Sequence, residues 1–271
     1  MGRDKATLPF GEETLVARVV RLVQAVVPDV RLVAREGQTL PEGFDAVRDP
    51  AEGLGPLAGL AAGLRALHAD RAFVAACDLP LLAPALVRFL LDEARDADAC
   101  VPRVGGFAMS ACAVYRRELG PVAARLLERG ERRLRVLLDQ VRTRYIEADL
   151  LRAVDPELAS FTDCGTPEAY DRALRRAGLV AIARVEFRGR WTVGPAPAPA
   201  TVPGANLLQV VRALAREWPE LVPEPRAGGW IPEDVAVMHR GVRATDPLTP
   251  VRAGETIRLI RFPLDATREP S

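Results

Sequence analysis

Short apolar runs alternate with amphipathic stretches from the start of the chain to about residue 178, and this alternation limits the possible folds more than any other feature. Strands are predicted at 30–34, 72–77, 99–103, 112–116, 144–147 and 159–162. Helical spacing is found at 15–27, 57–69, 85–94, 118–129, 133–140 and 167–178. Because the longer strand segments are apolar almost throughout, they favour a mostly parallel sheet covered by helices on both faces. We therefore predict a three-layer α/β/α domain over residues 1–179.

The pattern changes after Gly178, which is expected to end the last helix of the first domain. Residues 180–193 predict a strand or the first half of a hairpin, and a Pro-rich turn region follows at 194–204. An amphipathic helix is predicted at 206–221 with Asn206 as its N-cap, and strands are predicted at 234–242 and 255–264. We expect a second, small α+β domain over residues 180–271.

Composition excludes several classes of function. The net charge of the 271-residue chain is +1, which argues against a nucleic-acid partner. No apolar stretch approaches the roughly 20 residues of a transmembrane helix, and the N-terminus lacks a signal-type apolar run. The four cysteines are scattered and there are only two histidines, which disfavours a zinc site. We predict a cytoplasmic protein that binds neither membrane nor nucleic acid.

One basic residue differs from all the others. Of the 37 basic residues Lys5 is the only lysine, and the rest are arginine. A lone lysine is a candidate for a place where a compact ammonium is needed rather than a planar guanidinium. The alternative is chance at the N-terminus.

Two further segments have the composition of a nucleotide site. Asp78 follows a predicted buried strand, at the edge of a sheet where ligands bind, and its carboxylate could hold Mg²⁺; alternatively it only caps the next helix. The glycine-rich turn that contains Gly55 and Pro56 leads into a helix and could approach a ligand closely, or it could be a simple loop. Asp49 could accept hydrogen bonds from a base or ribose, or start a turn before Pro50.

Taken together, these segments resemble the MobA family, the molybdenum cofactor guanylyltransferases, over roughly residues 1–177. Met1-Gly2-Arg3-Asp4-Lys5 matches the end of the family's phosphate-binding loop, and LPFGEETLVARVV (8–20) is similar to the stretch that follows it. Further matches are Asp49 with GLGPLAGLAAGL, Cys77-Asp78-Leu79-Pro80, GERRLRVLLD (130–139) and Thr166-Pro167-Glu168. The resemblance implies a Rossmann-like nucleotidyltransferase domain.

The resemblance also implies a reaction. A molybdopterin-type phosphate would attack the α-phosphate of GTP at Mg²⁺ and release pyrophosphate. It assigns Lys5 to the triphosphate, Asp78 to the metal, and Asp49, Gly55 and Pro56 to the guanine nucleotide, with Lys5 and Asp78 as the catalytic pair. Transfer from CTP, transfer to a sugar phosphate, and a non-catalytic scaffold in cofactor assembly remain alternatives.

The chain departs from the family pattern in three places. It starts inside the phosphate loop, and we expect the upstream DNA to encode the preceding strand and glycines. Met109-Ser110 replaces the usual His-Pro, and Asp163-Cys164-Gly165 replaces the usual Asn-x-Asn, where Asp163 could still bind metal. These changes are expected to affect the pterin side and a second metal contact.

Residues 182–264 resemble the β-grasp sulfur carriers of the MoaD and ThiS type. The matching segments are ARVEFRG (183–189), NLLQVVRALAREWPEL (206–221), VAVMHRGV (235–242) and TDPLTPVRAGETIRLI (245–260). The family's terminal Gly-Gly is not found, so this domain is expected to dock or stabilise rather than carry sulfur. The resemblance implies partners among other molybdenum cofactor assembly proteins or molybdoenzymes.

Overall fold

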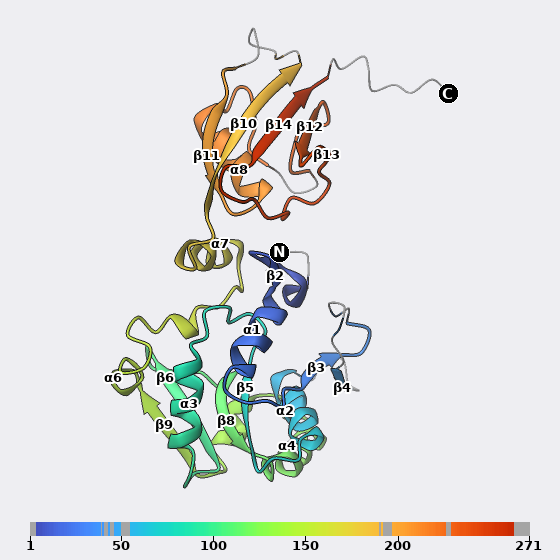
Figure 1. Ribbon diagram of the computed structural model, residues 1–271. Coiled ribbons are helices and arrows are strands. Elements are labelled where there is room, and N and C mark those ends of the chain that lie inside the picture. The colour runs from blue at the N-terminus through green and yellow to red at the C-terminus, as the bar shows by residue number, and fades with distance from the viewer. Residues whose placement is uncertain are drawn as a thin grey trace. The chain divides into compact units, whose positions relative to one another are not determined.

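The chain divides into two compact units in a computed structural model (Figure 1). Residues 4–38, 40, 43, 46–49, 55–189, 191, 197–225 and 229–262 are described. The first unit contains Met1–Leu8 and Glu13–Ala173, and the second contains Pro9–Glu12 and Leu174–Ser271. The division falls within helix α7 (Pro167–Arg176), slightly before the domain boundary after residue 179 that the sequence predicts.

The first unit is built on a mixed sheet. Its strand order is β5-β8-β6-β7, and β9 pairs with β6. These strands are β5 (Arg71–Ala75), β6 (Ala99–Val104), β7 (Phe107–Ala108), β8 (Cys112–Arg116) and β9 (Thr143–Glu147). Only the β6–β9 pair is parallel, whereas β8 is antiparallel to both of its neighbours. The prediction of a mostly parallel sheet is therefore wrong for this sheet.

The length of one connection explains the reversal. A parallel return needs a crossover of about a dozen residues or more. Only seven residues separate Val104 from Cys112. They contain the turn at Gly105-Gly106, where both glycines have positive φ, and the two-residue strand β7. The chain can only turn back on itself, so β8 pairs antiparallel beside β6.

Helices nevertheless cover both faces of this sheet, as predicted. Alternate residues of β8 point to opposite sides: Ala113 and Tyr115 belong to one core, whereas Cys112 and Val114 belong to the other. The first core receives side chains from α2 (Gly55–Ala66), α4 (Leu119–Glu128) and α5 (Leu134–Leu138). The second receives side chains from α1 (Leu15–Gln24), α3 (Pro84–Glu93) and α6 (Ala148–Leu151). The unit is a three-layer α/β/α sandwich.

Several short elements complete the first unit. A 3-10 helix, η1 (Lys5–Thr7), lies near the N-terminus, and the two-residue strand β2 (Glu13–Thr14) precedes α1. Strand β1 (Pro9–Phe10), between them in sequence, belongs to the second unit. Strands β3 (Leu32–Arg35) and β4 (Ala46–Asp49) form a separate parallel pair.

The strand predicted at 159–162 is wrong. This segment forms a 3-10 helix, η2 (Ala159–Phe161), which follows Leu158 in the left-handed conformation. The buried carboxylate of Asp155 accepts hydrogen bonds from the backbone N–H groups of Ala159 and Ser160 at 3.0 and 2.8 Å. Local side-chain hydrogen bonds of this kind offer the backbone an alternative to pairing in a sheet.

The second unit is a five-stranded sheet with one helix, in the order β11-β10-β14-β12-β13. Its elements are β10 (Ala181–Gly189), β11 (Ala200–Gly204), α8 (Leu207–Glu217), β12 (Val235–His239), β13 (Val242–Arg243) and β14 (Thr256–Arg261). As predicted, Asn206 caps α8: its side chain accepts a hydrogen bond from the N–H of Gln209 at 3.0 Å. The core lies between α8 and one face of the sheet.

Among the described residues, no helix has the length and apolar character needed to cross a membrane.

Candidate functional site

Lys5 and Asp78, which are 73 residues apart in sequence, meet in the first unit. The ammonium nitrogen Nζ of Lys5 lies 2.9 Å from Oδ2 of Asp78 and donates a hydrogen bond to it. The Lys5 side chain is 41% exposed and that of Asp78 is 16% exposed, so the pair lies at a surface that a ligand can reach. The structure therefore brings together the two residues that the sequence predicted as catalytic.

The segment before Lys5 is fixed by hydrogen bonds. The carboxylate of Asp4 caps η1 by accepting the N–H of Ala6 at 3.0 Å, and it also accepts the side-chain amide of Gln38 at 2.7 Å. Gln38 follows β3, so this contact ties the lysine segment to the β3 region. Lys5 is thus held in place by the fold of the first unit rather than left at a loose terminus.

Asp78 follows β5 and does not cap the helix that comes next. Helix α3 begins at Pro84, and its N-cap residue is Ala83, which has no side-chain cap. The N–H of Ala83 instead donates to Oγ of Ser160 at 2.9 Å. The alternative role of Asp78 as a helix cap is therefore excluded for α3. The Asp78 carboxylate contacts Lys5 instead.

The charges at this site keep the lysine protonated. The hydrogen bond to Asp78 is the largest cause that raises the pKa of Lys5 above its ordinary value, and partial burial opposes it. The negative charges of Asp78 and Asp163 raise the pKa further. Lys5 is a permanent cation at neutral pH, which suits a group that neutralises phosphate charge.

Asp163 is a second carboxylate at the same place. Its Oδ1 accepts the N–H of Gly165 at 2.7 Å, and the N–H of Cys164 donates to the backbone oxygen of Asp78 at 3.1 Å. A side chain at position 165 would not fit as the site stands, since its Cβ would lie 2.7 Å from Oδ1 of Asp163 and 3.7 Å from Nζ of Lys5. The missing side chain of Gly165 leaves room for the Asp163 carboxylate beside Lys5.

The two neighbouring cysteines are poor nucleophiles. Burial is the main cause that raises the pKa of the Cys77 thiol to about 11 and that of Cys164 to about 12, with a further contribution from the charge of Asp78. Both thiols are protonated at neutral pH, and the thiolate is the reactive form. Covalent catalysis by cysteine is not supported here.

The predicted base-binding residues lie on other elements. Asp49 ends β4, where it pairs with Arg35 of β3, and its side chain lies outside the described part of the structure. Gly55 and Pro56 are the exposed first residues of α2, and Gly55 has a φ of +72°. A Cβ at Gly55 would approach the backbone oxygen of Arg132 to 3.3 Å. No contact between these residues and the Lys5–Asp78 pair is found in the described residues.

Met109 and Ser110, which replace the usual His-Pro pair of the family, have a structural role here. Met109 packs partly buried against the second core, and its N–H donates to the backbone oxygen of Pro102 at 2.8 Å. The backbone oxygen of Ser110 accepts the hydroxyl of buried Tyr115 at 2.7 Å. These two residues therefore secure the turn between β7 and β8.

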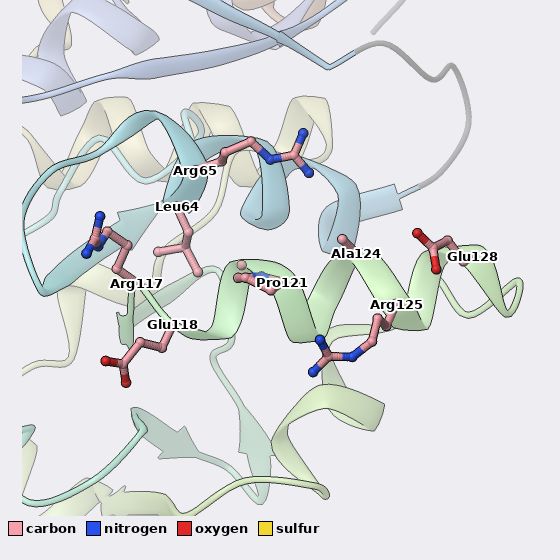
Figure 2. A pocket seen from close by; sticks show the side chains of 9 residues that line it. Leu64, Arg65, Arg117, Glu118, Pro121, Ala124, Arg125 and Glu128 are labelled. Carbon is pink, nitrogen blue, oxygen red and sulfur yellow. The ribbon is translucent and has the colours of Figure 1, made fainter.

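A separate pocket lies between α2 and α4 (Figure 2). Its volume is about 570 Å³, and it is lined by Leu64, Arg65, Arg117, Glu118, Gly120, Pro121, Ala124, Arg125 and Glu128. None of the predicted site residues lines it. Leu64 and Arg65 are eight and nine residues along α2 from Pro56, which places them about 12 to 14 Å away along the helix axis. In Figure 2 the guanidinium groups of Arg65, Arg117 and Arg125 point in different directions.

The carboxylates at the site fit a magnesium ion that is bound with a nucleotide. No group of three or more His, Cys, Asp or Glu side chains that could hold a metal occurs among the described residues. Mg²⁺ in nucleotide sites is held by one or two carboxylates, with phosphate oxygens and water as the remaining ligands. Asp78 already binds a cation, the ammonium of Lys5, and Asp163 acts on that same ammonium.

Comparisons with known proteins agree with the architecture. Residues 1–144 match the model of the MobA-like NTP transferase domain, which is more than half of the chain. The chain is 36% identical over 184 residues to a probable molybdenum cofactor guanylyltransferase of Mycobacterium avium, covering 65% of this chain and 89% of the relative. It is 33% identical over 175 residues to the molybdenum cofactor guanylyltransferase of Desulfosudis oleivorans, covering 64% of this chain and 86% of the relative.

A solved structure has the same fold. It is the molybdopterin-guanine dinucleotide biosynthesis protein A of Archaeoglobus fulgidus, with a TM-score of 0.55 and 24% identity. The match covers 65% of this chain and 92% of that one. The fold of the first unit and the family match define a nucleotidyltransferase. The chain belongs to the MobA-like NTP transferase family.

Proposed function

We propose that this protein transfers GMP from GTP to a molybdopterin cofactor and releases pyrophosphate. The observation that carries the proposal is the contact between Lys5 and Asp78, a cation and a carboxylate that the fold holds together after strand β5. The names of the relatives from Mycobacterium avium and Desulfosudis oleivorans support guanylyl transfer in particular.

In this proposal the residues act by position and charge. A phosphate oxygen of the acceptor attacks the α-phosphorus of GTP, the bond from that phosphorus to the bridging oxygen breaks, and pyrophosphate leaves. Lys5 would neutralise negative charge on the triphosphate as the leaving group departs. Asp49, Gly55 and Pro56 would bind the guanine nucleotide, with the N–H groups at the start of α2 available as donors.

Asp78 would hold a magnesium ion, with Asp163 as a second carboxylate ligand or water acceptor. When bound, the ion supplies charge neutralisation between the phosphates. The ammonium of Lys5 occupies Oδ2 of Asp78, so this hydrogen bond would open only if the metal took that oxygen. The Lys5 ammonium would then be able to turn to the phosphates, which present a more concentrated negative charge.

The test is calorimetry with GTP, CTP and ATP, each with Mg²⁺ and with EDTA, followed by pyrophosphate release in the presence of molybdopterin. We expect Mg²⁺-dependent binding of GTP at least tenfold tighter than that of CTP, and release only with the acceptor. Asp78→Asn is expected to weaken Mg²⁺-dependent GTP binding at least tenfold. Asp149→Asn is the matched control, because Asp149 is a 98% exposed aspartate on α6 of the same unit.

Three results would count against the proposal. Tighter binding of CTP than of GTP would replace the guanylyl assignment with a cytidylyl one. Equal effects of the two asparagine variants would remove Asp78 from the site. Binding of no nucleotide with Mg²⁺ would favour the non-catalytic scaffold.

We also propose that residues 180–271 form a β-grasp domain that docks or stabilises. The strand order β11-β10-β14-β12-β13 supports this, because the first and last long strands pair in parallel at the centre and α8 crosses one face. A solved structure without the β10–β14 pair would overturn it. We place the reaction in the cytoplasm, with partners among molybdenum cofactor assembly proteins or molybdoenzymes.

A further inference from the structure

The sheet of the second unit has two different faces. Val185, Phe187, Ile257 and Leu259 point to the side covered by α8 and form its core. The alternate residues of the same strands point to the other side, and none of the described helices of this unit contributes to that side. We refer to this second side as the outer sheet face; its central residues are Arg184, Glu186, Arg188, Ala236, Met238, Arg243, Thr256, Arg258 and Ile260.

The strand register places four arginines on the outer sheet face. One row across the sheet reads Glu186, Arg258, Met238 and Arg243, since each of these residues is directly opposite the next. Arg184 and Arg188 lie two residues before and after Glu186 on the same side of β10. Exposed arginines from three strands, β10, β14 and β13, therefore lie on the outer sheet face, whereas β12 contributes half-buried Met238 and buried Ala236.

The Glu186 carboxylate contacts three of these arginines. Oε2 of Glu186 accepts a hydrogen bond from Nε of Arg258 at 3.0 Å and from Nη2 of Arg188 at 3.3 Å, and Nε of Arg184 lies 3.6 Å from Oε1. Glu186 is only 17% exposed, whereas the arginines are 50–64% exposed. Three arginine side chains therefore surround and partly cover the Glu186 carboxylate, so positive charge exceeds negative charge in this cluster.

Arg243 adds a fourth cation. It is exposed, and no ion pair of its side chain is found in the described part of the chain. With Glu186 as the single acid among the nine central residues, the outer sheet face has a surplus of positive charge although the whole chain is nearly neutral at +1. An unbalanced charge of this kind on one face is a feature of surfaces that steer a partner of opposite charge.

Apolar side chains lie between the arginines. Met238 and Ile260 are half-buried in the middle of the outer sheet face, and Ile182, at its β10 end, is 55% exposed. Arginine and methionine are both enriched in the buried parts of protein interfaces. The face thus combines a cationic surface with apolar positions that a partner could cover.

We propose that the outer sheet face docks a partner protein through an acidic surface with interspersed apolar side chains. A nucleic acid fits less well, because none of the nine central residues is aromatic and could stack on a base, and a carboxylate lies among them. The proposal does not depend on the proposed guanylyl transfer, since it concerns the second unit alone.

The probe is a synthetic peptide of alternating glutamate and leucine, titrated into the 271-residue protein and followed by NMR chemical shifts and calorimetry. We expect saturable binding that weakens with added salt, with shift changes on β10, β14 and β12. Arg243→Glu and Arg188→Glu should each weaken binding at least fivefold. The matched control is Arg216→Glu, which changes an exposed arginine of α8 and should leave the affinity within twofold.

Other occupants give distinct results, and each would overturn the proposal. Single-stranded DNA that binds more tightly than the peptide would make the face a nucleic-acid surface. A concentration-dependent dimer that Arg243→Glu disperses would make it a contact between copies. If Arg243→Glu instead lowered the urea midpoint of unfolding clearly below that of Arg216→Glu, the face would already be covered within the chain. Equal losses with Arg216→Glu, or no saturable binding, would also refute it.

Discussion

Replacing Lys5 separates its contribution to folding from its contribution to nucleotide binding. At 2.9 Å, two unit charges attract by about 1.4 kcal/mol in water and by about 6 kcal/mol at an effective dielectric constant of about 20. Lys5 is 41% exposed, so solvent screening and side-chain entropy reduce the net value to about 1 kcal/mol or less. We therefore expect Lys5→Met to lower the free energy of unfolding by no more than about 1 kcal/mol.

The same substitution should change two ligand affinities in opposite directions. Removing the ammonium frees the Asp78 carboxylate, so Mg²⁺ alone should bind up to about fivefold more tightly, which corresponds to about 1 kcal/mol. GTP in the presence of Mg²⁺ should bind at least tenfold more weakly, because the triphosphate loses its cation. The raised pKa of Lys5 keeps it charged, so in the unmodified protein its contribution should not change between pH 6 and pH 9.

Calorimetry with Mg²⁺ and with Mg²⁺–GTP, together with urea unfolding, measures all three quantities. Lys5→Arg is the matched control for charge: it should preserve stability and part of the GTP affinity, but it should not restore the full rate because a planar guanidinium replaces a compact ammonium. The reasoning is refuted if Lys5→Met weakens Mg²⁺ binding, or if it leaves GTP binding unchanged while destabilising the fold by several kcal/mol.

Three further predictions concern other residues. Gly165→Ala should turn the Asp163 carboxylate away, because the new Cβ would lie 2.7 Å from its Oδ1, and Mg²⁺ affinity measured by calorimetry should fall severalfold; an unchanged affinity would remove Asp163 from the metal site. Burial alone raises the pKa of Glu255, but hydrogen bonds from the N–H of Arg252 and from His239 and Arg240 lower it to about 2. The ionised Glu255 carboxylate therefore stabilises the fold above the unfolded pKa of about 4.3, and this effect is lost as the pH falls towards 2. Urea unfolding between pH 5 and pH 3 should show a smaller loss of unfolding free energy in Glu255→Gln than in the unmodified protein. An identical dependence of the unfolding free energy on pH in the two proteins would contradict this. Asn206→Ala should cost about 1 kcal/mol of unfolding free energy by removing the cap of α8, whereas Asn206→Asp, which keeps the acceptor, should cost less; thermal unfolding compares the two, and equal losses would exclude the cap as the cause.

The sequence by itself determined the elements with a strong local signal. Helix α8 and its cap Asn206 were predicted because hydrophobic periodicity and capping depend on residues within a few positions of each other. The apolar strands β6 and β8 and the three-layer arrangement followed from the same kind of pattern. The family resemblance of the first unit, which the match over residues 1–144 bears out, also depends on motifs that are read along the chain.

Only the tertiary structure decided which distant residues meet. The direction of β8 depended on the length of the turn before it, and the 3-10 helix at Ala159–Phe161 depended on the Asp155 carboxylate, so apolar character alone gave the wrong result at both places. The contact of Lys5 with Asp78 and the cluster of arginines on the outer sheet face join residues far apart in sequence. Local sequence fixes which side of an element a residue occupies, but the packing of elements against one another decides what lies opposite it.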